Sequence, residues 1–448
     1  MPPLLDRQRG GRFRIAPAEG GYVSKQRYFP GSAVLITRFM AAGGVGEVID
    51  FMPVPDPTRP TDNHRLVRMV RVVRGQMRFR VECMPRFDYG RADHTLELTE
   101  DGARFRAKGL DLTLHTARLL TFDQDDVRAR HPHGDGIEVS ATAKAGEVGG
   151  VMLETAADGP PRRLTAAEIT SLFDDTVAFW RRWLGRSTYR GRWREQVARS
   201  AMTLKLMTYA PSGALVAAPT AGLPEQLGGE RNWDYRFTWI RDASFSVYAL
   251  LGLGYAEEAR AFLRWLADRV QEQVGVGSGP LKIMYRVDGS SDLAEQTLGH
   301  LEGYRGSAPV RIGNGASDQL QLDIYGEAID SIYFAHRHGT SIPHQGWARL
   351  SGILDWLSEH WDAPDEGVWE TRGGRQDFVY GRINSWTAFD RAIRLAADTG
   401  RPGNVARWLT ERDHIYRQVM DRGWHDKRAA FVQHYATDVL DAALLRMV

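Results

Sequence analysis

The chain has 448 residues, of which 43% are hydrophobic and 25% are charged. This length allows two or three domains, and this composition is ordinary for a globular protein with a large core. Lys and Arg together number 58 and Asp and Glu number 56, so the net charge is +2. We therefore expect neither nucleic acid nor a membrane surface as a partner. The single cysteine, Cys83, excludes an intrachain disulfide and any metal cluster built from several cysteines.

The first residues lack the apolar segment of a signal peptide. No apolar run in the sequence reaches the roughly 18 residues that a membrane-spanning helix needs. We therefore expect a cytoplasmic protein.

The first 160 residues have the pattern of short strands, rich in β-branched and aromatic residues, as at 34–40, 46–52 and 76–83. The turn Glu100-Asp101-Gly102 separates two strand-like segments at hairpin spacing. Cys83 lies in an alternating run, which predicts a buried thiol on a strand. Many short strands with regular turns predict a β-sandwich, which we expect to end at Asp158-Gly-Pro-Pro161.

After residue 161 the apolar period becomes helical. Thr165-Ala-Ala-Glu168 has the sequence of a capping box, and helical apolar faces follow it and recur from residues 259, 325 and 347. Further helices are expected at 385–398, 403–420 and 436–448. Strands followed by helices predict an α+β chain with its two kinds of structure in separate domains. The sequence ends inside an apolar pattern without a helix-stopping residue, so we expect a truncated chain.

Several common kinds of site lack support. The motifs of phosphate-binding loops, dinucleotide folds, serine hydrolases and zincins do not occur in the sequence. His131, His133 and Asp135 could be metal ligands, but their turn-rich surroundings favour a solvated loop. We therefore expect no metal and no organic cofactor.

Tryptophan is abundant, with 13 copies. Its ring stacks on the C–H faces of sugars, and its N–H donates a hydrogen bond. Most copies, including Trp180, Trp265 and Trp347, are expected to fill the core between helices. Two loops, residues 228–242 and 362–374, instead combine Trp with Asp, Glu and Arg. Loops on a rigid scaffold are the usual place for a binding site.

Each loop has two interpretations. Arg241 and Asp242 could bind adjacent hydroxyls of one sugar ring, or Asp242 could cap a helix that starts near Ala243, with Arg241 as its counter-ion. Trp369 could form an apolar wall beside Glu370, which would raise the pKa of this carboxyl and make it a general acid near neutrality. Alternatively, Glu370 could be a loop glutamate that faces solvent.

Larger blocks of sequence resemble glycoside hydrolase family 15, the glucoamylases and bacterial trehalases. The blocks keep the order of the family and are residues 218–242, Leu301-Glu-Gly-Tyr-Arg-Gly306, residues 313–322, Gly367-Val-Trp-Glu370 and Phe431-Val-Gln433. Residues 24–26 and 46–53 also resemble the N-terminal sandwich of the family.

This resemblance implies a β-sandwich at 1–160, linker helices at 161–210 and an (α/α)6 barrel at 211–448. It implies that Glu370 is the general acid of an inverting glycosidase. The residues that would hold the terminal glucose are Trp239, Arg241 and Asp242, with Trp369 lining the pocket and the backbone of Gly315 approaching the sugar. The substrate would be a small carbohydrate, either trehalose or an α-gluco-oligosaccharide.

The chain departs from the family pattern at both ends. The catalytic base of the relatives would lie beyond residue 448, and their first strands would precede residue 1. An inactive fragment or sugar-binding remnant is therefore one alternative. A phosphorylase, which needs only one carboxylic acid, is another, although no phosphate-binding loop supports it.

Overall fold

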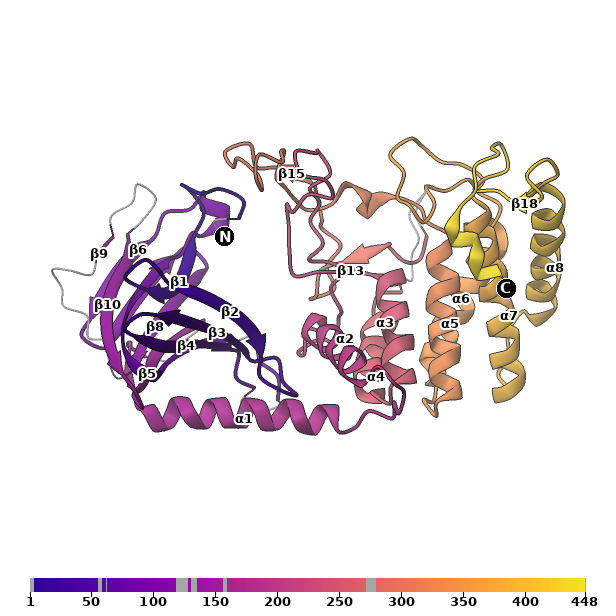
Figure 1. Ribbon diagram of the computed structural model, residues 1–448. Helices are drawn as coiled ribbons and strands as arrows, with labels where there is room; N and C mark the ends of the chain where they lie inside the picture. Colours follow the sequence, from indigo (N-terminus) through magenta and orange to yellow (C-terminus); the bar gives the residue numbers. More distant parts are fainter. Residues whose placement is uncertain are drawn as a thin grey trace. The chain divides into compact units, whose positions relative to one another are not determined.

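The computed structural model of the protein describes residues 4–54, 59–61, 63–117, 128–129, 135–155, 159–270 and 279–447. The chain forms two compact units (Figure 1). The first unit contains Met1–Ser187 together with Gly222–Asn232 and Leu298–Val310. The second contains Thr188–Ala221, Trp233–Thr297 and Arg311–Val448.

The first unit is built mainly from antiparallel strands. Its main path has the order β2-β3-β4-β5-β11-β8-β7-β6, and the short β12 pairs in parallel with β8. The strands are β1 (Arg12–Pro17), β2 (Val23–Tyr28), β3 (Leu35–Ala41), β4 (Gly44–Phe51), β5 (Arg65–Met84), β6 (Thr95–Thr99), β7 (Gly102–Ala107), β8 (Leu110–Ala117), β9 (Arg128–Ala129), β10 (Gly136–Lys144), β11 (Val148–Thr155) and β12 (Arg163–Leu164), with a short 3-10 turn, η1 (Asp88–Gly90).

The long strand β5 belongs to two sheets. Its first half pairs with β4 and β11, and its second half pairs with β1 and β10. Side chains alternate between the faces of a strand. Val70 and Val72 therefore pack in one apolar cluster, while Val67 and Met69 pack in another. Cys83 is buried in the first cluster, where burial raises the pKa of its thiol to about 12. The predicted strand thiol is confirmed.

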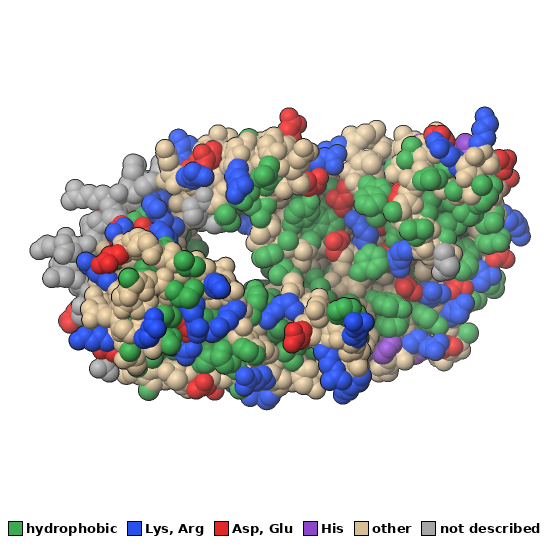
Figure 2. All heavy atoms as spheres, in the orientation of Figure 1, with side chains coloured by type: hydrophobic (Ala, Val, Ile, Leu, Met, Phe, Trp, Pro, Cys, Tyr) green, Lys and Arg blue, Asp and Glu red, His purple; other side chains and the backbone are tan. Residues whose placement is uncertain are grey.

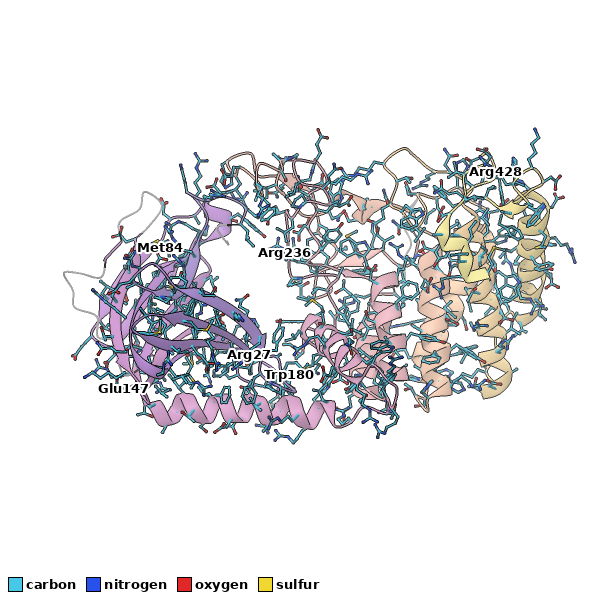
Figure 3. The ribbon with its side chains drawn as sticks, in the orientation of Figure 1. Arg27, Met84, Glu147, Trp180, Arg236 and Arg428 are labelled. Atoms are coloured by element: carbon cyan, nitrogen blue, oxygen red, sulfur yellow. The ribbon has the colours of Figure 1, made fainter. Side chains whose placement is uncertain are left out.

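The second cluster is covered by helix α1 (Ala166–Leu184), which runs beside the strands in Figure 1. The predicted capping box starts this helix, because the Thr165 hydroxyl and the Glu168 carboxylate each accept the other residue's backbone N–H. Ile169 and Val177 pack into the cluster, as their helical spacing predicted. Trp180, labelled in Figure 3, is only 5% exposed and fills the core as expected.

The second unit is mainly helical. Helices α3, α5 and α7 pack side by side, and each is followed in the chain by an outer partner, α4, α6 or α8. The helices are α2 (Arg194–Met207), α3 (Ile240–Gly252), α4 (Ala256–Ala267), α5 (Asp323–Arg337), α6 (His344–His360), α7 (Val379–Thr399) and α8 (Val405–Arg422). The short elements are β13 (Thr238–Trp239), β14 (Met284–Tyr285), β15 (Gln296–Thr297), β16 (Arg311–Ile312), η2 (Gly315–Asp318), β17 (Trp424–His425), β18 (Ala430–Phe431) and η3 (Ala442–Met447).

The predicted fold class, a sheet domain followed by a helical domain, is confirmed. Trp265 and Trp347 are buried between helices, as predicted. The finer division at residues 160 and 210 stays a prediction.

The predicted helix at 436–448 is wrong. Within the described residues 436–447, the 3-10 turn η3 is the only helical element, because the preceding backbone makes other bonds. The N–H of Gln433 donates to the carbonyl of Val439, and the N–H of Val439 donates to the Thr437 hydroxyl. Asp441 then accepts the N–H of Ala443 and begins the turn.

Two further expectations concern membranes and metals. Among the described helices, none is both long enough and apolar enough to cross a bilayer. The described residues also contain no group of three or more His, Cys, Asp or Glu side chains placed to hold a metal ion. His131 and His133 lie outside the described residues.

Candidate active site

Three chain segments that lead into α3, α5 and α7 meet in the helical unit. The first ends in β13, whose pairing with β14 fixes Trp239 immediately before α3. The second, residues 311–322, leads into α5, and the third, residues 361–378, joins α6 to α7 and carries Glu370. Figure 2 shows the surface of this unit hollowed near β13 and α3, with acidic and basic side chains inside the hollow.

The Glu370 carboxyl is at the centre of the hydrogen bonds between these segments. Its Oε1 accepts a bond of 2.7 Å from Trp239 Nε1 and one of 3.2 Å from Arg241 Nη2. Its side chain is 23% exposed, so it is enclosed but still reaches solvent. The structure therefore brings together three of the residues that the sequence singled out, from two loops far apart in the chain.

Arg241 connects Glu370 to a second buried carboxylate. Its Nη1 donates to Gln321 Oε1 and to Asp323 Oδ2, both at 2.9 Å. The Asp323 side chain is only 1% exposed, and that of Arg241 is 11% exposed. A buried charge needs such pairing, because removal from water is otherwise costly. Arg241 is thus held in place by the segment that leads into α5.

The pKa of Glu370 is raised above its ordinary value, chiefly because burial disfavours the charged carboxylate. The positive charge of Arg241 and hydrogen bonds from Trp239 and Gln321 oppose this shift without cancelling it, and the charge of Asp242 adds to it. A carboxyl in this environment keeps its proton to a higher pH than a surface glutamate. Such a group is able to act as a general acid.

The backbone at Glu370 is strained. Glu370 has φ 52°, in the left-handed region that non-glycine residues rarely adopt. Its N–H donates to the carbonyl of Gly367, which closes a turn. Gly367 has φ +71°, and a Cβ there would lie 2.7 Å from the Phe378 ring, so only glycine fits. Strain of this kind collects at functional sites, where the surrounding structure holds it in place.

Asp242 lies in the first turn of α3 but does not cap the helix. The N-cap position belongs to Trp239, and no side chain makes the capping bond there. Asp242 is exposed, and within the described part of the chain its carboxylate accepts no hydrogen bond from another residue. Burial nonetheless raises its pKa, opposed by the charge of Arg241. The side chain of Asp242 therefore touches solvent, while most of its surroundings are protein. This combination is expected for a side chain that lines a hollow. Asp242 can therefore accept hydrogen bonds from a ligand.

Trp369 and Gly315 are held by separate interactions. Trp369 is 57% exposed, and its Nε1 donates to Asp441 Oδ2 at 2.8 Å. The indole of Trp239 donates a hydrogen bond to the Glu370 carboxyl, and the expected wall at Trp369 stays a prediction. The N–H of Gly315 donates to Glu295 Oε2 at 3.0 Å, and this oxygen also binds Arg372 Nη2 at 2.8 Å. Gly315 is thereby joined to the loop that carries Glu370.

Sequence reasoning missed three residues that support this site: Gln321, Asp323 and Asp365. Gln321 and Asp323 hold Arg241, and Asp365 accepts the N–H of Leu322 at 2.8 Å. All three are fully buried. For Gln321 and Asp323, the available signal was that two polar residues stand directly before the predicted helical face that begins at Tyr325. Polar residues in this position are more typical of a helix that starts at the surface.

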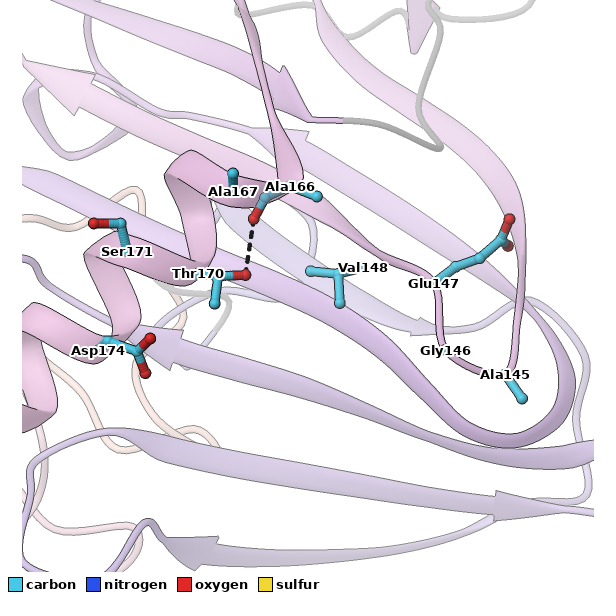
Figure 4. A pocket seen from close by; sticks show the side chains of 9 residues that line it. All are labelled: Ala145, Gly146, Glu147, Val148, Ala166, Ala167, Thr170, Ser171 and Asp174. Atoms are coloured by element: carbon cyan, nitrogen blue, oxygen red, sulfur yellow. Dashed lines mark hydrogen bonds between the residues drawn. The ribbon is translucent and has the colours of Figure 1, made fainter.

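A different pocket lies in the sheet unit, between the β10–β11 turn and α1 (Figure 4). Two of its polar groups are already engaged locally. The Thr170 hydroxyl donates to the carbonyl of Ala166 at 2.8 Å, and the Glu147 carboxylate accepts the N–H of Lys144 at 2.7 Å. Its lining residues include no Arg, Lys or His, so it offers no acid–base pair.

Comparison with known proteins shows the family of the chain. Residues 191–448 match the family described as glycosyl hydrolases family 15, and residues 2–127 match the family described as trehalase-like, N-terminal. A trehalase from Mycolicibacterium smegmatis is 36% identical, over 99% of this chain and 68% of its own length. A trehalase from Thermoplasma acidophilum is 32% identical, over 99% of this chain and 74% of its own length.

Among solved structures, a wild-type glycosidase matches with a TM-score of 0.44 and 19% identity, over 57% of this chain and 63% of its own. The family match covers more than half of the chain. The chain therefore belongs to glycosyl hydrolases family 15, a family of glycosidases, as its sequence motifs predicted.

Proposed function

We propose that this chain carries the acid-catalytic site of an inverting glycosidase that hydrolyses trehalose to glucose, with Glu370 as the general acid. The observation that carries the proposal is the Glu370 carboxyl itself. It is held by Trp239 and Arg241, its pKa is raised by burial, and it sits on a strained turn. A partly buried, fixed carboxyl with a raised pKa is suited to the protonation of a glycosidic oxygen.

In the proposed reaction, Glu370 gives its proton to the glycosidic oxygen as the bond from that oxygen to the anomeric carbon breaks. Water attacks the same carbon from the opposite face and loses its proton to a carboxylate that acts as base. Asp242 binds hydroxyls of the terminal glucose through its exposed carboxylate, and Trp239 encloses the same ring. Arg241 keeps the Glu370 carboxyl oriented.

The choice of trehalose is supported by the relatives. The two proteins described above are named trehalases, and each aligns with 99% of this chain. The N-terminal match, trehalase-like, points in the same direction. The proposal therefore extends to the substrate as well as to the reaction. The expected cytoplasmic location stays a prediction.

Proton NMR of the fresh products tests both the substrate and the stereochemistry. Inversion at one carbon of trehalose releases one β-glucose and one α-glucose, whereas retention releases two α-glucose molecules. We expect the first result with the wild-type protein and almost no product with its Glu370→Gln variant. Equal rates on maltose and trehalose would contradict the substrate assignment. Turnover only with added phosphate would favour a phosphorylase, and sugar binding without turnover would favour a sugar-binding remnant.

A further inference from the structure

The loop that carries Glu370 is joined, where it enters α7, to a segment much later in the chain, residues 433–441. Phe378 and His434 form an antiparallel bridge, and the backbone hydrogen bonds on either side of it measure 3.0 Å and 3.2 Å. These bonds lie at the start of α7, which is packed against α5 and α8. The 433–441 segment is therefore fixed to the base of the loop.

The same segment reaches the loop a second time through Asp441. The N–H of Gln433 donates to the carbonyl of Val439 at 2.9 Å, which folds the segment back toward its start. Asp441 Oδ2 accepts bonds from Trp369 Nε1 at 2.8 Å and from Gln433 Nε2 at 3.2 Å. Its Oδ1 accepts the N–H of Ala443 at 2.9 Å. Both oxygens of the carboxylate are therefore engaged, and its orientation is fixed.

The bond from Asp441 restrains a side chain that is otherwise open to solvent. Trp369 is 57% exposed, and exposed side chains change rotamer rapidly when nothing holds them. A hydrogen bond to a charged acceptor is stronger than one between neutral groups, and this one holds the far end of the indole. Trp369 is thus kept in one orientation by a residue 72 positions later in the chain.

Glu370 directly follows Trp369, and its backbone is the strained part of the loop, with φ 52°. The N–H of Glu370 donates to the carbonyl of Gly367, and the N–H and hydroxyl of Thr371 both donate to the carbonyl of Glu366. A strained backbone persists only where surrounding contacts hold it. These bonds lie within the loop itself, whereas the Trp369 indole ties the turn to a separate part of the chain.

We propose that Asp441 is a positioning residue for the general acid, which it holds in place through Trp369. The 433–441 segment contacts the loop at its base and again at Trp369, so the turn that carries Glu370 is fixed between two contacts. Loss of the Asp441 bond frees the indole and lets the turn relax. The Glu370 carboxyl then moves relative to the Trp239 indole, which donates to it at 2.7 Å. This inference rests on the proposed function for the role of Glu370.

Asp441→Ser breaks this contact selectively. A serine hydroxyl can accept the N–H two residues later, as the carboxylate of Asp441 does for Ala443. Thr437 already makes such a bond in the same segment, to the N–H of Val439 at 3.2 Å. The hydroxyl is too short to reach the indole as well, so the variant keeps the local turn and loses the bond to Trp369.

Nuclear magnetic resonance of the indole N–H groups tests the link without requiring activity. In protein with isotope-labelled tryptophan, each Nε1–H gives one signal, and the variants Trp369→Phe and Trp239→Phe identify two of these signals. We expect Asp441→Ser to shift the signals of both Trp369 and Trp239, because the Trp239 indole reports the position of the Glu370 carboxyl. A shift of the Trp369 signal alone, or of neither signal, would overturn the proposal.

Two further variants separate this link from general damage. Trp369→Phe breaks the same bond from its other end and keeps the Asp441 turn, so it should also shift the signal of Trp239. An unchanged Trp239 signal in this variant would overturn the proposal even if Asp441→Ser did not fold. Asp438→Ser is the matched control, since Asp438 lies in the same segment but pairs with Arg428, and both side chains are more than half exposed. Shifts of both signals in the control would contradict a specific role for Asp441.

Kinetics give the functional readout. Asp441→Ser should lower kcat by about 10- to 100-fold with little change in KM, because a small displacement of a catalytic group is costly. In the Trp369→Phe background it should have no further effect on kcat, since both changes break one contact. Losses that multiply would overturn the proposal. If the wild type does not hydrolyse trehalose, the proposed function fails, but the indole signals still decide whether Asp441 positions Glu370.

Discussion

Arg241→Met provides a strong test of the charged network at the site. The Arg241 guanidinium makes three hydrogen bonds, to Gln321, Asp323 and Glu370. The Met side chain has a similar length but no charge, so it leaves Asp323 as a buried carboxylate without its counter-ion. Asp323 is only 1% exposed, and solvent cannot compensate. Breaking one side of a buried pair costs about 3–5 kcal/mol, and we expect the free energy of unfolding to fall by that amount.

Urea denaturation with linear extrapolation measures this loss. The double variant Arg241→Met/Asp323→Asn should recover most of it, because the unpaired charge is then gone. Arg407→Met is the control, since Arg407 and Glu359 form an exposed ion pair, with side chains 43% and 60% exposed. Such pairs contribute about 0–1 kcal/mol. A loss below about 1 kcal/mol for Arg241→Met, or additive losses in the double variant, would refute the argument.

Four further outcomes are expected. Glu370→Gln should lower kcat by about 10²–10⁴-fold with little change in KM, and a loss of kcat of only a few-fold would contradict the role of Glu370. In the wild type, kcat/KM should fall as the pH rises through the raised pKa of Glu370. Asp242→Ala should lower kcat/KM by about 10- to 150-fold, the worth of hydrogen bonds to a charged group, with an unchanged melting temperature; a drop in melting temperature alone would indicate a structural role. Gly367→Ala should destabilise by about 1–3 kcal/mol in urea denaturation, because its Cβ meets Phe378 and its φ is positive; wild-type stability would show that the turn adapts. The pKa of Asp365 is raised to about 7, so its protonated form should stabilise the folded state. This contribution to the free energy of unfolding, roughly 4 kcal/mol, should be complete below about pH 4 and lost as the pH rises through 7. Identical curves of unfolding free energy against pH for the wild type and Asp365→Asn would contradict this.

The sequence by itself determined the local structure, because the deciding interactions join residues close in the chain. The capping box at Thr165 and Glu168 spans three residues, and the hairpin at Glu100-Asp101 joins adjacent strands. Apolar residues at helical spacing identified α5 and α6, because a helix places such residues on one buried face. The motifs around Trp239 and Glu370 also pointed to the right loops, although not to their contacts.

Only the tertiary structure decided how the site is assembled. Trp239 and Glu370 are 131 residues apart in the chain, and no local pattern shows that the indole of Trp239, rather than that of Trp369, binds the carboxyl. The burial of Asp323 and Asp365 depends on the packing of loops against α5 and α7, which no local pattern of the sequence shows. The incorrect helix at 436–448 has the same cause. Its apolar spacing fits a helix, but the hydrogen bonds of Gln433 and Val439 take the backbone along another path.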